Sequence, residues 1–205
     1  MKYQSAVLYE GSGQAQAVPL EAMEMRRRIV WLDEEITPEV ANSVVRKISH
    51  LAAESDRPIV LAIDSPGGSV DAGLVICDAV TGCGAPVTTA CVGRAYSMAA
   101  VVLSSGSRRL MTPSSKAMVH QPLIRQMPGG SSDDVEVLSG ELREAKARLN
   151  SILKKNTGRS LREVERATKH DTFFTAEEAV KFGLADEVAD LSVALAGEGV
   201  SLWRI

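Results

Sequence analysis

The sequence predicts an α/β fold built from repeated strand–turn–helix units with parallel pairing. Segment 59–63 is a short, continuous run of apolar, largely β-branched residues, which is typical of a buried parallel strand. A turn containing glycine and then a helical segment follow it, and the same order recurs from residue 87 to residue 104. With 205 residues, the chain can bury a sizeable core as one domain without a disulfide or a metal.

The first half of the chain supplies most of these elements. Thr37 and Pro38 mark a helix start, because the hydroxyl can cap the helix and proline fits its first turn. Residues 93–96 are expected to turn the chain, so that Ser97 opens a helix of small residues. In chain order we expect strands at 29–32, 59–63 and 87–92, each followed by a helix, at 38–53, 70–80 and 97–104.

A long helix is the main feature of the second half, after short strands at 110–111 and 117–119. It is expected over about 134–156, where Gly158 stops it. Its apolar residues step by four and three, which leaves a narrow seam suited to packing on the chain's own core or on another subunit. The seam consists of Leu138, Leu142, Ala145, Leu149 and Ile152. A last unit runs over 161–188 and contains a helix at 176–182.

Composition and charge exclude several classes of protein. The net charge of −3 gives no basic field for nucleic acid, and the cluster at 26–28 is interpreted as a solvated entrance to the first strand. No apolar run reaches membrane-spanning length, and residues 1–18 do not have the pattern of a signal peptide. Three cysteines without metal spacing are expected to be reduced, in a cytoplasmic protein without a metal.

Two glycine-associated turns at strand ends are candidate sites, because ligands bind at the carboxyl ends of parallel strands. The turn at 65–69 lacks both phosphate-loop spacings, so its glycine amides suit either a structural turn or an oxyanion hole. Ser97 at a helix start is either a simple cap or a nucleophile. A nucleophilic serine needs a base and an orienting acceptor: His120 lies at a strand end, and Asp171 could serve it from another segment.

Four stretches of the chain resemble the proteolytic subunit of the Clp protease, ClpP, from about residue 28 to residue 188. They are IDSPGGSVDAG at 63–73, CVGRAYSM at 91–98, MVHQP at 118–122 and HDTFFTAEEA at 170–179, in family order. The resemblance implies a ClpP/crotonase-type fold and a serine endopeptidase that hydrolyses unfolded proteins. It implies the domain limits 1–27 for an N-terminal axial segment, 28–190 for the peptidase and 191–205 for a tail.

The resemblance also assigns roles to individual residues. Ser97 matches the nucleophile, His120 the general base and Asp171 the orienting carboxylate, while Gly68 and Met98 match the backbone oxyanion donors. The long helix matches the handle through which two seven-membered rings of identical chains stack. A separate AAA+ unfoldase feeds such a chamber, and because this chain has no nucleotide loop, ATP is expected to act only through that partner.

Several positions depart from the family pattern. Asp64 stands where asparagine is usual, Tyr96 replaces a small residue and can narrow substrate access, and His170 replaces an arginine that links assembly to activity. Segments 1–25 and 124–128 do not match either. The positions expected to line the unfoldase pocket are usually aromatic but are here Val60, Ala62 and Leu110. We therefore expect weaker or atypical docking of the unfoldase.

Two other functions remain open at this point. The chain could be a non-catalytic ring subunit, although inactive members usually lack part of the triad and this chain keeps all of it. It could also be an acyl-CoA hydratase or isomerase on the same superfamily fold, an enzyme that needs no serine at position 97. A serine-reactive probe separates that enzyme from a peptidase.

Overall fold

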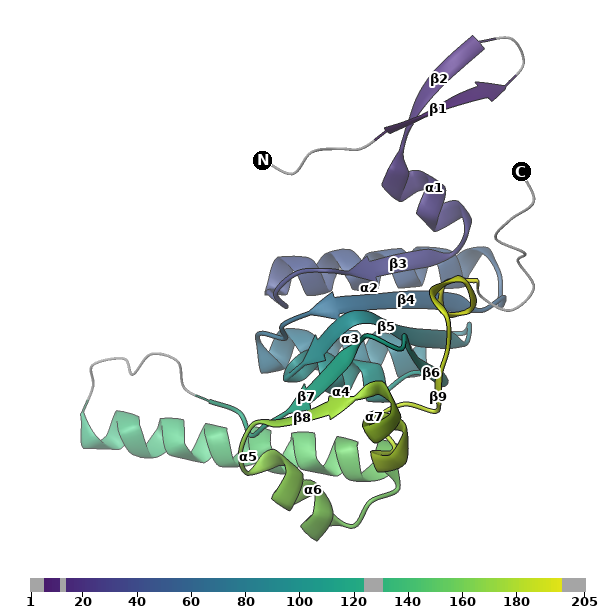
Figure 1. Ribbon diagram of the computed structural model, residues 1–205. Helices are drawn as coiled ribbons and strands as arrows, with labels where there is room; N and C mark the ends of the chain where they lie inside the picture. The colour runs from purple at the N-terminus through teal and green to yellow at the C-terminus, as the bar shows by residue number, and fades with distance from the viewer. Residues whose placement is uncertain (1–5, 12–13, 124–130, 197–205) are drawn as a thin grey trace.

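A seven-stranded sheet forms the centre of the molecule in the computed structural model (Figure 1). The structure describes residues 6–11, 14–123 and 131–196, and of 8–11 and 14–16 only the backbone. The strands are β3 (Ile29–Leu32), β4 (Ile59–Ser65), β5 (Val87–Tyr96), β6 (Arg108–Met111), β7 (Lys116–Val119), β8 (Thr172–Thr175) and β9 (Glu187–Val188). The order is β3–β4–β5–β6–β9, with β7 beside the end of β5 and β8 beside β7.

All pairings in this sheet are parallel except that of β7 with β8. The helices α2 (Pro38–Glu54), α3 (Val70–Gly82) and α4 (Met98–Ser104) connect the first strands and cover one face of the sheet (Figure 1). The predicted cap of α2 is present, since the Thr37 side chain accepts a hydrogen bond from the N–H of Val40. The α/β class with mostly parallel pairing is confirmed.

The central strands are buried on both faces, which explains why their sequence is continuously apolar. In β4, Ile59, Leu61 and Ile63 face the main core under the helices. Val60 and Ala62 face the opposite side, in a smaller cluster with Ala90 and Leu110. The short helix α8 (Leu191–Ala194) closes this second cluster, because Ala194 is fully buried in it.

The N-terminal segment contains regular structure that the sequence did not indicate. Strands β1 (Ala6–Gly11) and β2 (Gln14–Pro19) form an antiparallel hairpin, and helix α1 (Leu20–Arg26) joins it to β3. The hairpin projects from the body of the molecule (Figure 1). Whether this segment faces a partner stays a prediction, as do the domain limits.

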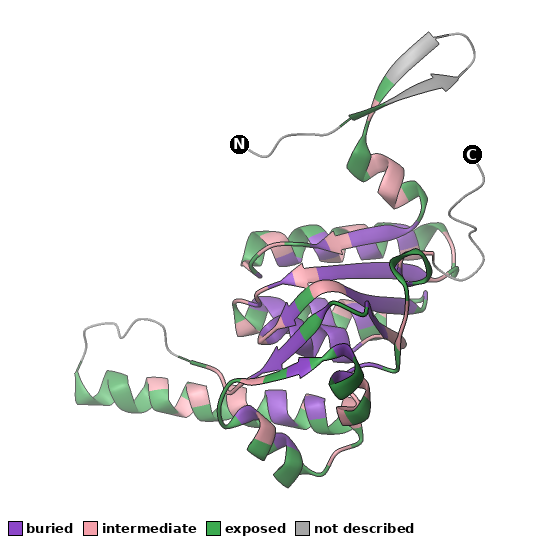
Figure 2. Cartoon of the chain, in the orientation of Figure 1, coloured by how far each residue is buried: buried purple, intermediate pink, exposed green. Residues whose placement is uncertain are grey.

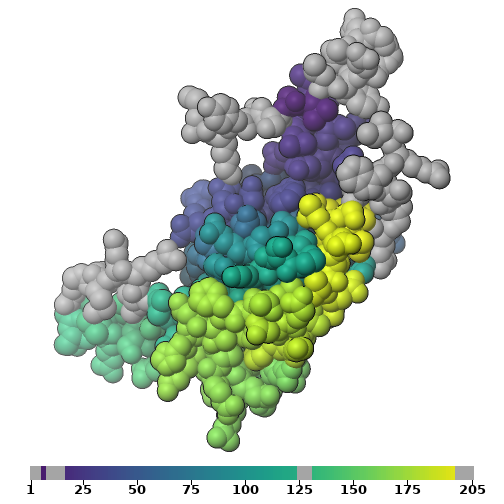
Figure 3. All heavy atoms as spheres, viewed as in Figure 1, coloured from purple at the N-terminus to yellow at the C-terminus, as the bar shows by residue number. Residues whose placement is uncertain are grey.

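Helix α5 (Ser132–Thr157) is the predicted long helix, and it begins two residues earlier than expected. Its buried residues all lie in the C-terminal half, at Leu149, Asn150 and Leu153, while the N-terminal half extends beyond the body (Figures 1 and 2). Helices α6 (Leu161–Thr168) and α7 (Ala176–Phe182) complete the C-terminal part: α6 packs on α5, and α7 packs on β7, β8 and β9. Their atoms lie together at the lower side of the molecule (Figure 3). The atypical segment 124–128 lies outside the described residues.

Two local expectations were wrong. Residues 93–96 do not turn the chain: they extend β5, because Arg94, Ala95 and Tyr96 pair in register with β7. Arg28 is not solvated but 5% exposed, and its guanidinium donates to three carbonyls in the loop after α2. Those carbonyls belong to Ser55, Arg57 and Pro58. In the described part of the chain, no helix has both the length and the apolar character to cross a membrane.

Candidate active site

Ser97 lies between the end of β5 and the first residue of α4, in an unusual backbone conformation. Its φ of 54° is in the left-handed region, which residues other than glycine rarely adopt. The neighbouring strand holds it there, because the Ser97 N–H donates to the carbonyl of Met118 at 2.8 Å. A sharp junction of this kind aims a side chain out of the end of the sheet, as in a nucleophile elbow.

His120 and Asp171 are brought to Ser97 by the pairing of β7 with β5 on one side and with β8 on the other. Because Val119 pairs with Thr172 in the antiparallel ladder, the next residue on one strand lies beside the preceding residue on the other. The Nε2 of His120 is 2.7 Å from Ser97 Oγ, and its Nδ1 is 3.1 Å from Asp171 Oδ1. The fold thus brings together three residues that the sequence separates by 23 and 51 positions.

The turn of Gly67 and Gly68 lies against the same junction. Gly67 has a φ of +89°, and a Cβ atom there would be 2.5 Å from the carbonyl oxygen of Tyr96 and 2.8 Å from the Cβ of Ser97. Gly68 has a φ of +154°, and a Cβ there would be 2.3 Å from the carbonyl oxygen of Ile36. Both positions therefore require glycine. The turn thus approaches the serine closely enough for a backbone amide to act there.

A small cavity of about 20 Å³ opens beside Ser97 and His120. Its walls are mostly apolar and include Val70, Met98 and Leu153. Two polar residues that the sequence did not single out also line it: Thr168 donates to the Oδ1 of Asn150 at 3.1 Å, and both are buried. In the sequence, the one feature that could have pointed to these two residues is that each is a polar residue on the inner face of its helix.

The other two histidines do not join this site. His50 is exposed on α2 and lies 3.4 Å from Glu54, as expected for a surface residue. His170 is also exposed. Tyr96 packs its ring edge-on against Phe173, with ring centroids 5.6 Å apart, and so links the ends of β5 and β8. Its expected effect on substrate access stays a prediction.

The three positions expected to line an unfoldase pocket do not form a surface pocket in this chain. Val60, Ala62 and Leu110 are at most 1% exposed, because Ala194 and Leu195 pack over them. The expectation failed because no pattern in the tail indicates that it forms α8 on this face. Weaker or atypical docking stays a prediction, but its reason is now a covered face rather than small pocket walls.

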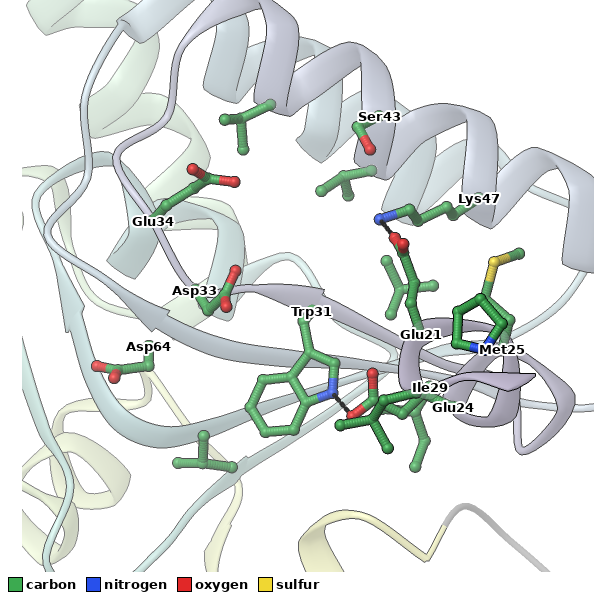
Figure 4. Close-up of a pocket in the computed structure, with 16 residues that line it drawn as sticks. Glu21, Glu24, Met25, Ile29, Trp31, Asp33, Glu34, Ser43, Lys47 and Asp64 are labelled. Atoms are coloured by element: carbon green, nitrogen blue, oxygen red, sulfur yellow. Dashed lines mark hydrogen bonds and ion pairs between the residues drawn. The ribbon is translucent and has the colours of Figure 1, made fainter. Parts of the chain in front are cut away.

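A larger groove of about 630 Å³ lies at the base of α1 (Figure 4). Trp31 Nε1 donates to Glu24 Oε1 at 2.9 Å, and Lys47 forms an ion pair with Glu21. Partial burial raises the pKa of Glu24, although the hydrogen bond from Trp31 opposes this shift. The groove shares no lining residue with the Ser97 cavity, and among the described residues no group of histidine, cysteine and carboxylate side chains could hold a metal.

These features define an α/β protein in which a serine, a histidine and a carboxylate converge at the end of a mostly parallel sheet. In a comparison with family models, the chain matches the family described as Clp protease over residues 12–192. The match spans most of the chain, and the chain therefore belongs to the Clp protease family. It is a peptidase of the ClpP type, and this family forms ring oligomers that work with AAA+ unfoldases without a cofactor in the peptidase itself.

Proposed function

We propose that this chain is a serine endopeptidase subunit of an ATP-dependent Clp protease, with Ser97 as nucleophile, His120 as general base and Asp171 as orienting carboxylate. The observation that carries the proposal is the 2.7 Å contact between Ser97 Oγ and His120 Nε2. This distance is within hydrogen-bond reach, as proton transfer requires. The 3.1 Å contact of Nδ1 with Asp171 supports a fixed imidazole tautomer.

Each residue has a defined task in acylation. Ser97 Oγ attacks the peptide carbonyl carbon while His120 Nε2 accepts its proton, and Asp171 stabilises the imidazolium that forms. When the tetrahedral intermediate collapses, His120 donates that proton to the leaving amine and an acyl-enzyme remains. A water molecule, deprotonated by His120, then hydrolyses the ester and restores Ser97.

The backbone amides of Gly68 and Met98 are the proposed oxyanion donors. Support comes from the glycine turn, where a Cβ at Gly67 would lie 3.0 Å from the nitrogen of Met98. Donors placed in advance stabilise the negative charge that develops in the transition state. In other enzymes one such donor contributes about 3 kcal/mol to the lowering of the barrier.

The proposed substrates are unfolded polypeptides that reach the site inside two stacked seven-membered rings, fed by a separate AAA+ unfoldase. The exposed N-terminal half of α5 supports stacking, since Val135 is 44% and Val137 67% exposed in the single chain. Leu138 and Leu142, four residues apart on one face of the same half, are only half-buried in the single chain, which leaves apolar side chains available for a contact with another subunit. ATP would act through the unfoldase alone.

The test is peptide hydrolysis by the purified assembled protein and its Ser97→Ala variant. We expect the variant to assemble normally and to lose several orders of magnitude in kcat/KM, because it lacks the nucleophile. Equal hydrolysis by both proteins would contradict the serine mechanism. Assembly without hydrolysis by the wild type would favour a non-catalytic ring subunit, and turnover of an enoyl-CoA would favour a crotonase-type enzyme.

A further inference from the structure

Ser65 carries a buried hydroxyl that takes no part in the reaction proposed above. It is the last residue of β4, and it is 0% exposed. Its Oγ donates a hydrogen bond to the carbonyl of Glu34 at 2.6 Å and accepts one from the N–H of Gly67 at 3.1 Å. A buried hydroxyl that both donates and accepts restrains the two segments that it joins.

The bonds around the turn leave its two glycine amides in different situations. The N–H of Gly67 is bonded to Ser65. The N–H of Ile36 donates to the carbonyl of Gly67, and the carbonyl of Ile36 accepts from the N–H of Ser69, both at 2.8 Å. In this parallel bridge, the N–H of the residue between the two bonded positions points away from the partner strand. Gly68 therefore directs its N–H away from Ile36.

The glycines cannot fix this orientation by themselves. With φ values of +89° and +154°, Gly67 and Gly68 occupy backbone regions that only glycine adopts readily, and glycine also leaves them most easily. The turn lies against the nucleophile, since a Cβ on Gly67 would be 2.8 Å from the Cβ of Ser97. A small rotation of the peptide planes in the turn would thus change how its amides are placed relative to Ser97.

We propose that Ser65 is a positioning residue for the oxyanion donors. Its hydroxyl engages the N–H of Gly67 and, together with the backbone bridge to Ile36, holds the turn so that the N–H of Gly68 is presented to the reacting carbonyl. The inference rests on the proposed serine peptidase function and adds a side chain that keeps the turn in the orientation this function needs. Without Oγ, the buried N–H of Gly67 loses its acceptor, and the peptide rotates to find another.

The test compares Ser65→Ala with Ser115→Ala in the full assembled protein. Ser115 is a matched control because it is also buried, at 2% exposed, and its Oγ donates to a backbone carbonyl, that of Thr112, at 2.7 Å. The measurements are kcat and KM on a fluorogenic peptide, and the inhibition constant of a peptide boronic acid. That inhibitor forms a tetrahedral adduct whose oxygen probes the oxyanion site.

For Ser65→Ala we expect kcat to fall at least about tenfold, with KM changed less than about threefold. The affinity for the boronic acid should fall in parallel with kcat/KM, because both depend on the same donors. Ser115→Ala should change neither quantity more than about twofold, even where both variants melt earlier by a similar amount. Such a split cannot arise from lost stability alone.

Equal kinetic constants for the two variants would overturn the positioning role. If Ser65→Ala does not assemble, Ser65→Cys serves in its place, because a thiol of similar size forms only weak hydrogen bonds. Wild-type kcat and boronic acid affinity in that variant would also overturn the proposal. A wild-type protein that neither hydrolyses the peptide nor binds the boronic acid would instead overturn the proposed function itself.

Discussion

At the scale of single residues, the site depends on a serine in a strained backbone conformation. Such a conformation costs about 1–3 kcal/mol and persists only where the surroundings hold it. Here the hydrogen bond to Met118 and the close approach of Gly67 hold Ser97 in place. The position of the Ser97 side chain is therefore sensitive to any side chain introduced at position 67.

Gly67→Ala is expected to lower activity more than stability. The new Cβ would lie 2.5 Å from the Tyr96 carbonyl oxygen, in a position with positive φ, so the turn must move away from Ser97. We expect a loss of at least about tenfold in kcat/KM and a lower melting temperature. Gly140→Ala is the control: a Cβ there meets nothing within 4 Å, and alanine stabilises a helix interior by up to about 1 kcal/mol.

The cysteines are expected to differ in reactivity toward iodoacetamide in the native protein. Burial raises the pKa of Cys77 to about 11 and that of Cys91 to about 12, so neither forms thiolate near neutral pH. Cys83 is partly exposed and should be alkylated first. Mass spectrometry of the labelled native protein checks this order, and modification of Cys91 before Cys83 would contradict it.

The sequence identified the residue types of the site but not their contacts. Ser97, His120 and Asp171 could be named because strand ends and family motifs mark them. Their distances depend on the registers of β5, β7 and β8, which no single segment encodes. Arg28 was misinterpreted for a similar reason: its burial depends on carbonyls some 30 positions away, in the loop before β4.

At the scale of secondary structure elements, α5 has two different halves. The C-terminal half belongs to the chain's own core, where Leu149 and Leu153 are buried and also line the cavity beside Ser97. The N-terminal half has Leu138 and Leu142 only half-buried. The predicted apolar seam was therefore correct as a pattern, but Leu149 at its C-terminal end packs into the core of its own chain.

Replacing Leu138 and Leu142 together with Glu should separate stacked rings. The change would bury unpaired charge in the proposed contact between rings while sparing the core at Leu149. Light scattering should show a loss of about half the mass of the assembly. Glu141→Gln, at an exposed position of the same helix, should leave the mass unchanged. A stable monomer of the wild-type protein would contradict the stacking proposal.

The start of α5 should be sensitive to acid. Ser131 and Asp134 form a capping box, and the Ser131 backbone N–H, 2.8 Å from the carboxylate, lowers the pKa of Asp134 below its ordinary value of 3.8. A lowered pKa means that the carboxylate stabilises the fold above pH ~4 and that this contribution is lost as the pH falls through the lowered pKa.

Thermal melting across this pH range checks the sign for the Asp134→Asn variant. The wild type should melt at a higher temperature than the variant near neutral pH, and the difference should vanish below the lowered pKa. A difference that grows as the pH falls would contradict the assignment. Glu136→Gln is a control, since Glu136 is exposed in the same helix but is not the residue that closes the capping box.

At the scale of the whole molecule, the arrangement of layers explains which predictions succeeded. Continuous apolar strands indicated a sheet covered on both faces, and the structure has the large core on one face and the smaller cluster under α8 on the other. The sequence did not indicate α8 itself, because a four-residue helix has too few residues to show periodicity. The covering of the second face of the sheet is therefore the part of the fold that the sequence predicted least well.

The central claim, that Ser97 is an activated nucleophile, is tested most directly by labelling with a fluorophosphonate. The reagent should add one phosphonyl group to each wild-type chain, and peptide mapping should locate it on Ser97, because His120 lies 2.7 Å from the hydroxyl. The Ser97→Ala variant, with assembly unchanged, should remain unlabelled. Absence of labelling in an assembled wild-type protein, or a label located on another residue, would contradict the account.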